Sequence, residues 1–315
     1  MSLIEVCHLR KSFGDTVAVD DLSFSVEAGE IFGLVGPNGA GKSTTMMILA
    51  GLRQADAGTV TIAGLSPNKG NHALQRILGV VPQDLAIYSD LTAAENLDFF
   101  GGIYGLRGAD LKNRIQRVLE QTGLTSHANQ FVKTFSGGMK RRLNFGAALL
   151  HDPRCVILDE PTVGVDPQSR SHLLECVKQL AADGVGVIYA SHYMEEVEAI
   201  CRRVAIIDHG KILAQGTIEE LLDKSHADLY IRVAASESEL KQRLQGLAEV
   251  QATNSHESQA VIPRERKSAP GAVTGRLAKV LEALVAAKLD VVSVETREHN
   301  LERLFLELTG RKLRD

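Results

Sequence analysis

The fold of this chain is decided by the stretch Gly36-Pro37-Asn38-Gly39-Ala40-Gly41-Lys42-Ser43-Thr44. It fits the pattern G-x-x-x-x-G-K-[ST], in which glycines let the backbone amides turn toward a phosphate group. An apolar run at 30–35 precedes the loop, and an apolar helical pattern at 44–52 follows it. The sequence therefore predicts a phosphate-binding loop between a strand and a helix. Lys42 would reach the β- and γ-phosphates, and the Ser43 hydroxyl would ligate Mg²⁺.

The plain alternative for this stretch is a glycine-rich turn that binds nothing. With glycine at about 7% of residues, a chance match in a chain of this length is roughly a one in a hundred event. The order of strand, loop and helix is also what a phosphate-binding loop requires. Nucleotide binding is therefore the preferred interpretation.

Composition and charge restrict the class of protein. The chain has 315 residues, 44% hydrophobic and 23% charged, which suits a globular protein of two domains. A net charge of -4 provides no basic field, so no nucleic-acid partner is expected. The cysteines lack metal-type spacing and predict small buried side chains in a reducing compartment, the cytosol. Neither a signal-peptide pattern nor an apolar run of ~20 residues is present, so any membrane role would need a partner.

The first part of the chain has the pattern of antiparallel strands. Apolar residues recur at period two within residues 3–32, and Gly14-Asp15 marks a turn. Phe13 lies at the strand end beside this turn. Its ring either stacks on a base or belongs to the core, and the pattern gives the two readings equal weight.

Residues 85–150 have helical periodicity and predict a helical subdomain inserted in an α/β domain. Within it, Ser136, Gly137 and Gly138 directly precede a helix. Serine at such a position caps the helix, and the exposed amides of a first turn bind anions. This is a second predicted anion-binding helix start in the same chain.

Two adjacent carboxylates follow a buried strand at 155–158. Ligands of open α/β sheets bind at the carboxyl ends of strands, where Asp159 and Glu160 lie. Asp159 is predicted to hold Mg²⁺, and Glu160 to accept the proton of an attacking water. A solvated acidic turn is the alternative, which the apolar residues leading into the pair disfavour.

Two further polar residues end strands at the same predicted sheet edge. His192 follows the run 185–191, although a lone histidine is more often structural than catalytic. Gln83 follows another strand and is a candidate contact for Mg²⁺ or the attacking water. Most glutamines in such positions are simply solvated, so this signal is weak by itself.

Taken in order, these motifs resemble the nucleotide-binding subunit of ABC transporters over roughly residues 3–220. The resemblance implies a P-loop ATPase core with an antiparallel β subdomain and a helical subdomain, using ATP and Mg²⁺. It implies that the phosphates are wrapped by Gly39–Thr44. The roles that it implies for single residues are adenine stacking by Phe13, nucleotide sensing toward the permease by Gln83, polarisation of water by Glu160, a γ-phosphate contact by His192 and communication with the opposite subunit by Asp166.

In that family ATP lies between two subunits, and this chain has one copy of each motif. The resemblance therefore implies a homodimer or heterodimer with a second ATP-binding subunit, in which Ser136 and Gly138 cap the γ-phosphate of the partner's ATP. Two residues depart from the family pattern: Met139 stands in place of the usual glutamine, and Phe13 in place of tyrosine. Both keep the features that binding needs. Neighbouring residues resemble the branch that exports drugs, polysaccharides and lipid-type molecules.

Beyond a linker at 223–227, the pattern of strands and helices reads β-α-β-β-α-β, followed by a helix at 301–309. This order predicts a small ferredoxin-like α+β module. The expected domains are an ATP-binding domain, 1–222, and a C-terminal accessory domain, 228–315. Nothing catalytic is apparent in the second, so regulation or a dimer contact is the hypothesis for it.

The expected function is ATP hydrolysis that drives a separate integral membrane permease, from the cytoplasmic face of the membrane. The alternative is a soluble ABC ATPase acting on nucleic acid or ribosomes. Such DNA-acting members carry a long coiled coil between the two glycine motifs, and no sustained heptads separate Thr44 from Ser136 here. Ribosome-acting members usually carry two cassettes. A P-loop kinase would leave Ser136-Gly137-Gly138 unexplained.

Overall fold

The computed structural model describes residues 2–68, 70–223, 227–253, 257–264, 272–297 and 300–310. The chain divides into two compact units, Met1–Ile218 with Phe305–Asp315, and Glu219–Leu304. Most of the expected linker at 223–227 lies outside the described residues. In the part of the chain that is described, no helix is both long and apolar enough to span a membrane.

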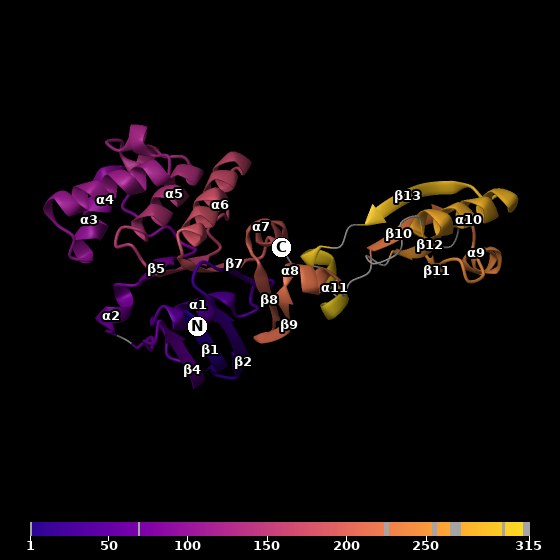
Figure 1. Cartoon of the computed structure of the whole chain (residues 1–315), viewed down its shortest axis with the longest axis horizontal. Helices are drawn as coiled ribbons and strands as arrows, with labels where there is room; N and C mark the ends of the chain where they lie inside the picture. Colours follow the sequence, from indigo (N-terminus) through magenta and orange to yellow (C-terminus); the bar gives the residue numbers. More distant parts are fainter. Residues whose placement is uncertain are drawn as a thin grey trace. The chain divides into compact units, whose positions relative to one another are not determined.

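A six-stranded sheet forms the centre of the first unit (Figure 1). Its order is β5-β6-β7-β3-β8-β9, with every neighbouring pair parallel except β8 and β9. Residues of β3, β6 and β7 are buried throughout, as in parallel sheets covered on both faces. The strands are β3 (Ile31–Val35), β5 (Leu78–Val81), β6 (Cys155–Asp159), β7 (Gly186–Ser191), β8 (Arg203–Asp208) and β9 (Lys211–Thr217).

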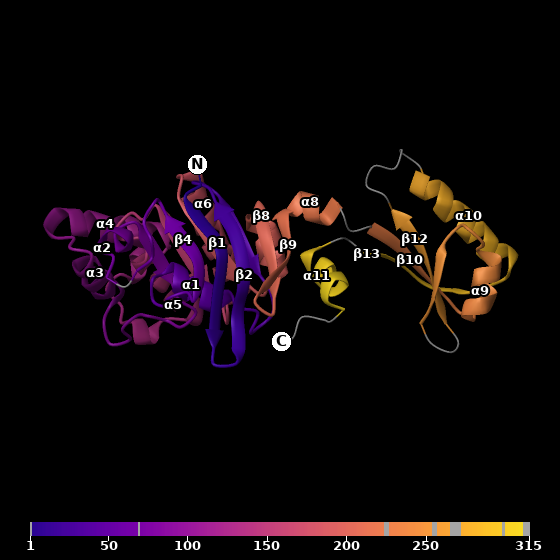
Figure 2. The ribbon, with the colours of Figure 1, turned by 90° about the horizontal axis from the view of Figure 1, so that it is seen from below.

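A second, antiparallel sheet of order β2-β1-β4 packs into the same core. Phe24 of this sheet stacks on Phe32 of the first, with ring centroids 5.1 Å apart. Figure 2 shows β1 and β2 as a long hairpin beside α1. The apolar period of the sequence predicted these strands. They are β1 (Ile4–Phe13), β2 (Thr16–Val26) and β4 (Ala57–Ile62), and α1 covers Lys42–Leu49.

Helices dominate the region between β5 and β6 and the two connections that follow. Thr92 and Glu95 form the capping box at the start of α3, where each side chain bonds the other residue's amide. The helices of the unit, apart from α1, are α2 (His72–Gln75), α3 (Ala93–Ile103), α4 (Gly108–Gln121), α5 (Gly137–Ala147), α6 (Pro167–Ala182) and α7 (Met194–Ile200), with short 3₁₀ turns at Thr125–His127 and Val132–Thr134.

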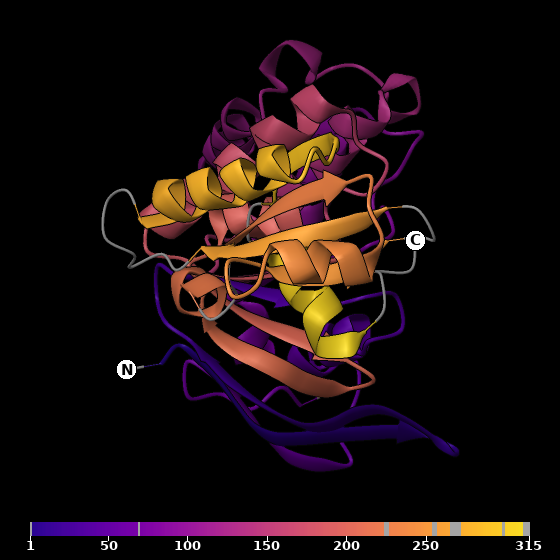
Figure 3. The ribbon, with the colours of Figure 1, turned by 90° about the vertical axis from the view of Figure 1, so that its right-hand side faces the viewer.

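The second unit is an antiparallel sheet of order β11-β12-β10-β13 with helices packed against it (Figure 3). Leu229, Ile231 and Val233 alternate along β10 and form its core with α9 and α10. The elements are β10 (Ala227–Val233), α9 (Glu237–Arg243), β11 (Glu249–Ala252), β12 (Ser258–Arg264), α10 (Ala272–Ala286) and β13 (Val291–Arg297), bordered in the sequence by α8 (Ile218–Asp223) and α11 (Leu301–Thr309).

Two of the four cysteines differ from the expectation that all are buried, because Cys176 is only half-buried and Cys7 is exposed. Cys155 and Cys201 are buried, as the sequence predicted, but Cys7 is exposed on β1. The alternation along that strand explains the difference, because Ile4 and Val6 face the core and Cys7 faces solvent.

Candidate active site

The loop between β3 and α1 is shaped by glycines that admit no side chain. Gly41 precedes the helix with φ of 105°, and a Cβ on it would lie 2.4 Å from the Ala18 carbonyl oxygen. At Gly36 an added Cβ would lie 2.2 Å from the Ile207 carbonyl oxygen. At these two positions the loop fits against β2 and β8 only as glycine, and the amides of the first turn of α1 are left for an anion.

Lys42 is the first residue of α1 and is only 4% exposed. Its Nζ donates to the carbonyl oxygens of Gly36, at 2.8 Å, and Pro37, at 3.1 Å. Glu160 Oε1 lies 3.3 Å from the same nitrogen. Burial lowers the pKa of Lys42, and the Glu160 carboxylate opposes that shift. The loop thus closes around its own lysine.

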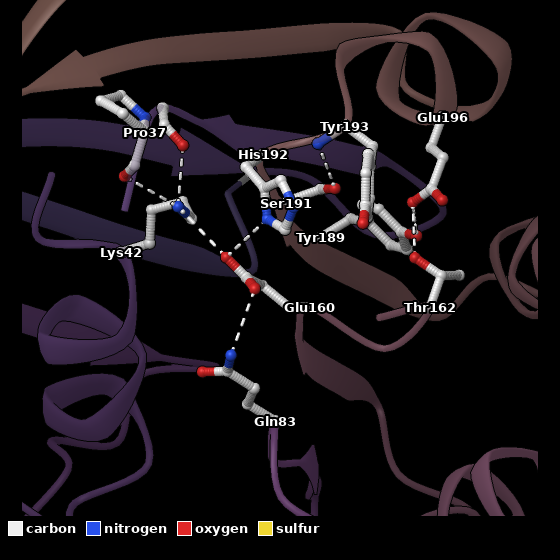
Figure 4. A network of polar contacts seen from close by, with 11 residues as sticks. Pro37, Lys42, Gln83, Glu160, Thr162, Tyr189, Ser191, His192, Tyr193 and Glu196 are labelled. Carbon is white, nitrogen blue, oxygen red and sulfur yellow. Dashed lines mark hydrogen bonds and ion pairs between the residues drawn. The ribbon is translucent and has the colours of Figure 1, made fainter. Parts of the chain in front are cut away.

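Glu160 connects the polar residues from several strand ends (Figure 4). Its Oε1 lies 3.1 Å from His192 Nδ1, and its Oε2 accepts a hydrogen bond from Gln83 Nε2 at 3.3 Å. The backbone of Glu160 has φ of 48°, a left-handed conformation that costs a non-glycine residue about 1 kcal/mol or more. The amide of Glu160 donates to the Ala190 carbonyl at 2.9 Å, which anchors the strained residue to β7.

Asp159 is the last residue of β6, and its contacts differ from those of Glu160. It is 8% exposed, and burial raises the pKa of its carboxyl, while a hydrogen bond with the Ser43 side chain lowers it. Among the described residues, Asp159 Oδ1 is buried without a hydrogen-bond partner. A buried carboxylate oxygen without a partner is costly and is normally satisfied by a cation or water.

Ser136, Gly138 and Asp166 form a separate group. Ser136 caps α5 by accepting from the Met139 amide at 3.2 Å, and Asp166 caps α6 by accepting from Ser169 at 2.9 Å. A Cβ on Gly138 would lie 2.2 Å from Ser169 Oγ, so α5 and α6 meet closely there. Within the residues that the structure describes, no hydrogen bond or ion pair joins this group to Lys42 or Glu160.

The remaining predicted residues lie in the loop or at its border. Asn38 and Gly39 are exposed at the loop, Ala40 is buried within it, and Thr44 is half-buried in the first turn of α1. Phe13 is 42% exposed at the β1–β2 turn, so the alternative that it is a core phenylalanine is wrong. Its ring lies 5.5 Å from Lys11 Nζ and 5.3 Å from the Arg53 guanidinium.

Sequence reasoning missed a residue that holds the Gln83 segment. Arg141 of α5 donates to the Gln83 carbonyl oxygen, and to the Val163 carbonyl oxygen at 3.3 Å. Burial lowers the pKa of this guanidinium. The one available signal was its place three residues after Gly138, on the helix that the glycines begin. Arg141 joins the segments around two predicted site residues.

The comparisons agree with this geometry. Residues 19–163 match the family model described as ABC transporter. The chain is 45% identical to the linearmycin resistance ATP-binding protein LnrL of Bacillus subtilis strain 168, over 99% of this chain and 100% of that protein. It is 38% identical to the Nod factor export ATP-binding protein I of Cupriavidus pinatubonensis, over 100% of this chain and 93% of that protein.

Solved structures point the same way. An ATP-binding subunit of an ABC transporter aligns with a TM-score of 0.65 and 31% identity, covering 71% of this chain and 93% of that one. The ATP-binding cassette MJ1267 in its ADP conformation aligns with a TM-score of 0.62 and 26% identity, covering 70% of this chain and 92% of the other.

Proposed function

This chain belongs to the ABC transporter family, as an ATP-binding and ATP-hydrolysing subunit of the exporter type, and we propose that hydrolysis takes place at Glu160. The observation that carries this assignment is the meeting of Lys42, His192 and Gln83 at one buried carboxylate. Charged and polar groups from distant segments converge there at the carboxyl edge of a parallel sheet, where ligands of such sheets bind.

Each group has a distinct proposed task. The amides of residues 36–44 surround the phosphates, and Lys42 exchanges its carbonyl partners for β- and γ-phosphate oxygens. Glu160 accepts the proton of the attacking water, and His192 contacts the γ-phosphate. Gln83 orients the water from its position on Glu160 Oε2. Phe13 offers an exposed aromatic face for adenine.

The residues around Asp159 fit Mg²⁺. Its Oδ1 is buried without a partner among the described residues, and the Ser43 hydroxyl lies beside the carboxylate, giving the oxygen donors that Mg²⁺ prefers. Asp159 and Ser43 would hold the ion, which neutralises charge on the phosphates when bound. Gln83, the third predicted ligand, hydrogen-bonds to Glu160 in this structure.

We propose that a second ATP-binding subunit, identical or different, completes the site. Ser136, an exposed residue, caps a helix that begins with the exposed Gly137 and the buried Gly138, and this group lies with Asp166 and not with Lys42. An anion-binding helix start with no phosphate loop of its own chain beside it suits the phosphate of a partner. Asp166, beside Gly138, would then lie at the contact between subunits.

The strand order of the second unit supports assigning it to a ferredoxin-like α+β module. We propose an accessory domain at 228–315 that follows an ATP-binding domain at 1–222, whereas compactness alone groups Phe305–Asp315 with the first unit. The tasks of the accessory domain would be regulation or a dimer contact. ATP-binding subunits of transporters work with membrane permease components. We place this one on the cytoplasmic face of the membrane, where the permease would receive it.

The test of this function is to identify what copurifies with the chain. The Glu160→Gln variant would be tagged and extracted from native membranes with ATP and Mg²⁺, because a variant that binds ATP without hydrolysing it keeps the assembly closed. A polytopic membrane protein is expected, with less of it when ATP is left out. Ribosomal subunits or DNA, without any membrane protein, would contradict the proposal.

A further inference from the structure

A third buried carboxylate, besides those of Asp159 and Glu160, lies near the site and has no task in the reaction described above. Glu196 of α7 is 3% exposed. Its Oε2 accepts hydrogen bonds from Thr162 Oγ1 at 2.7 Å and from the Tyr189 hydroxyl at 2.8 Å. Its Oε1 lies 3.2 Å from Arg170 Nε. Figure 4 shows this carboxylate beside the group around Glu160.

The partners of Glu196 come from segments that carry site residues. Thr162 lies in the turn that begins after Glu160 and ends at Asp166. Glu196 itself lies on the helix that begins just after His192. The turn is also held from its other side, because Arg141 donates to the Val163 carbonyl at 3.3 Å. The hydrogen bond from Thr162 thus joins the segment after Glu160 to the segment after His192.

The same network reaches the ring of His192. Tyr193 lies against it, with ring centroids 4.1 Å apart. The Arg170 guanidinium lies over the ring of Tyr193, 5.1 Å from its centroid. Arg170 is therefore shared between Glu196 and the neighbour of the histidine. A displacement of the Glu196 carboxylate would therefore alter the positions of both predicted catalytic residues, Glu160 and His192.

A buried carboxylate is a poor choice for stability alone. Desolvation of a charge costs several kcal/mol, and apolar replacements of such groups are often neutral or stabilising. Charge-assisted hydrogen bonds are directional, and they fix the geometry of the groups that make them. Burial raises the pKa of Tyr189, so its hydroxyl remains a donor. An apolar side chain in place of Glu196 would fill the same space, but it would not hold Thr162 in a defined position.

We propose that Glu196 is a positioning residue for ATP hydrolysis: through Thr162 it fixes the turn after Glu160 relative to His192. The proposal rests on the proposed roles of Glu160 and His192. In this proposal Glu196 contacts neither the nucleotide nor the attacking water. It acts by holding Glu160, the base, at a fixed position relative to His192. A misplacement of about 1 Å in such groups costs up to ~10²-fold in rate.

Two substitutions that each remove one hydroxyl donor from the same oxygen test this. Thr162→Val removes the donor on the turn, and Tyr189→Phe removes the donor on β7, whose backbone is fixed by ladders to β3 and β6. Thr162→Val should lower kcat at saturating ATP by about 10-fold, with the KM for ATP unchanged. Tyr189→Phe should change kcat by less than about twofold.

The controls separate positioning from folding. Thermal unfolding of both variants should shift alike, since each loses one bond to one carboxylate. Thr162→Ser should restore kcat, because it returns the hydroxyl. If Thr162→Val does not fold, Glu196→Gln replaces it: this variant loses the ion pair with Arg170 and should lower kcat more than Tyr189→Phe does.

Unchanged kcat in Thr162→Val, or an equal loss in Thr162→Val and Tyr189→Phe, would overturn the proposal. Glu160→Gln is measured in parallel as the reference. Full turnover in that variant would remove the assigned base and so the proposed function, whatever the ratio between the two hydroxyl variants.

Discussion

The two units of this chain bury different kinds of side chain. The nucleotide-binding unit buries Lys42, Asp159, Glu160 and Glu196, whereas the described core of the C-terminal unit consists of aliphatic residues and alanines. The buried polar residue recorded in the described part of that unit is Ser258. Both units fold around a sheet, so burying charge is not a requirement of the architecture. The charged residues buried in the first unit are those to which we assign catalytic, binding or positioning roles.

Because of this difference, we expect mutations in the two units to change different measured properties. A buried ion pair contributes little net stability, because desolvation offsets the attraction. A buried aliphatic side chain contributes about 1.5–3 kcal/mol through loss of water contact. Substitutions in the first network that keep its shape and hydrogen bonds should therefore alter catalysis more than unfolding, whereas truncations in the second core should alter unfolding.

The largest effect is expected at Glu160. Glu160→Gln keeps the shape of the side chain but removes the proton acceptor, so kcat should fall by about 10² to 10⁴ while ATP binding is retained. Steady-state ATPase assays and ATP titrations measure the two quantities. Glu282→Gln, at an exposed glutamate of α10 in the other unit, is the matched control and should leave both unchanged. Normal turnover in Glu160→Gln would contradict the assignment.

The second-largest effect is expected in the apolar core of the C-terminal unit. Ile231 is fully buried in the core of the C-terminal unit, and Ile231→Ala should destabilise that unit by about 2–5 kcal/mol because it leaves a cavity. Calorimetry would show an earlier unfolding transition, while ATP affinity stays unchanged. Ile231→Val should cost about 0.5–1.5 kcal/mol as the graded control. Loss of ATP binding below the unfolding temperature in either variant would mean that the units are not independent.

A smaller effect is expected for ground-state binding. Lys42→Ala removes a charge that would contact the phosphates, and such contacts are worth about 1.5–3 kcal/mol, or about 10- to 100-fold in ATP affinity. Isothermal titration measures this loss. Lys279→Ala, at an exposed lysine of α10, provides the control. Equal ATP affinities for the two variants would mean that Lys42 holds the loop backbone but makes no contact that strengthens ATP binding.

The sequence by itself determined the local features. The phosphate loop, the strand that delivers Asp159 and Glu160, and the capped helix at Ser136 each depend on residues within one short segment. Their backbone geometry follows from glycine spacing, apolar period and capping, which act over a few residues. The alternating strands and helices of the C-terminal unit were predictable for the same reason.

Only the tertiary structure decided which of these features meet. Gln83 reaches Glu160 across 77 positions of sequence because β5, β6 and β7 are neighbours in the sheet. The pairing of β6 and β7 likewise brought Thr162 to Glu196. The packed structure also left Phe13 exposed and grouped Ser136 with Asp166. No local pattern encodes such contacts, since they depend on how whole elements pack to bury apolar surface.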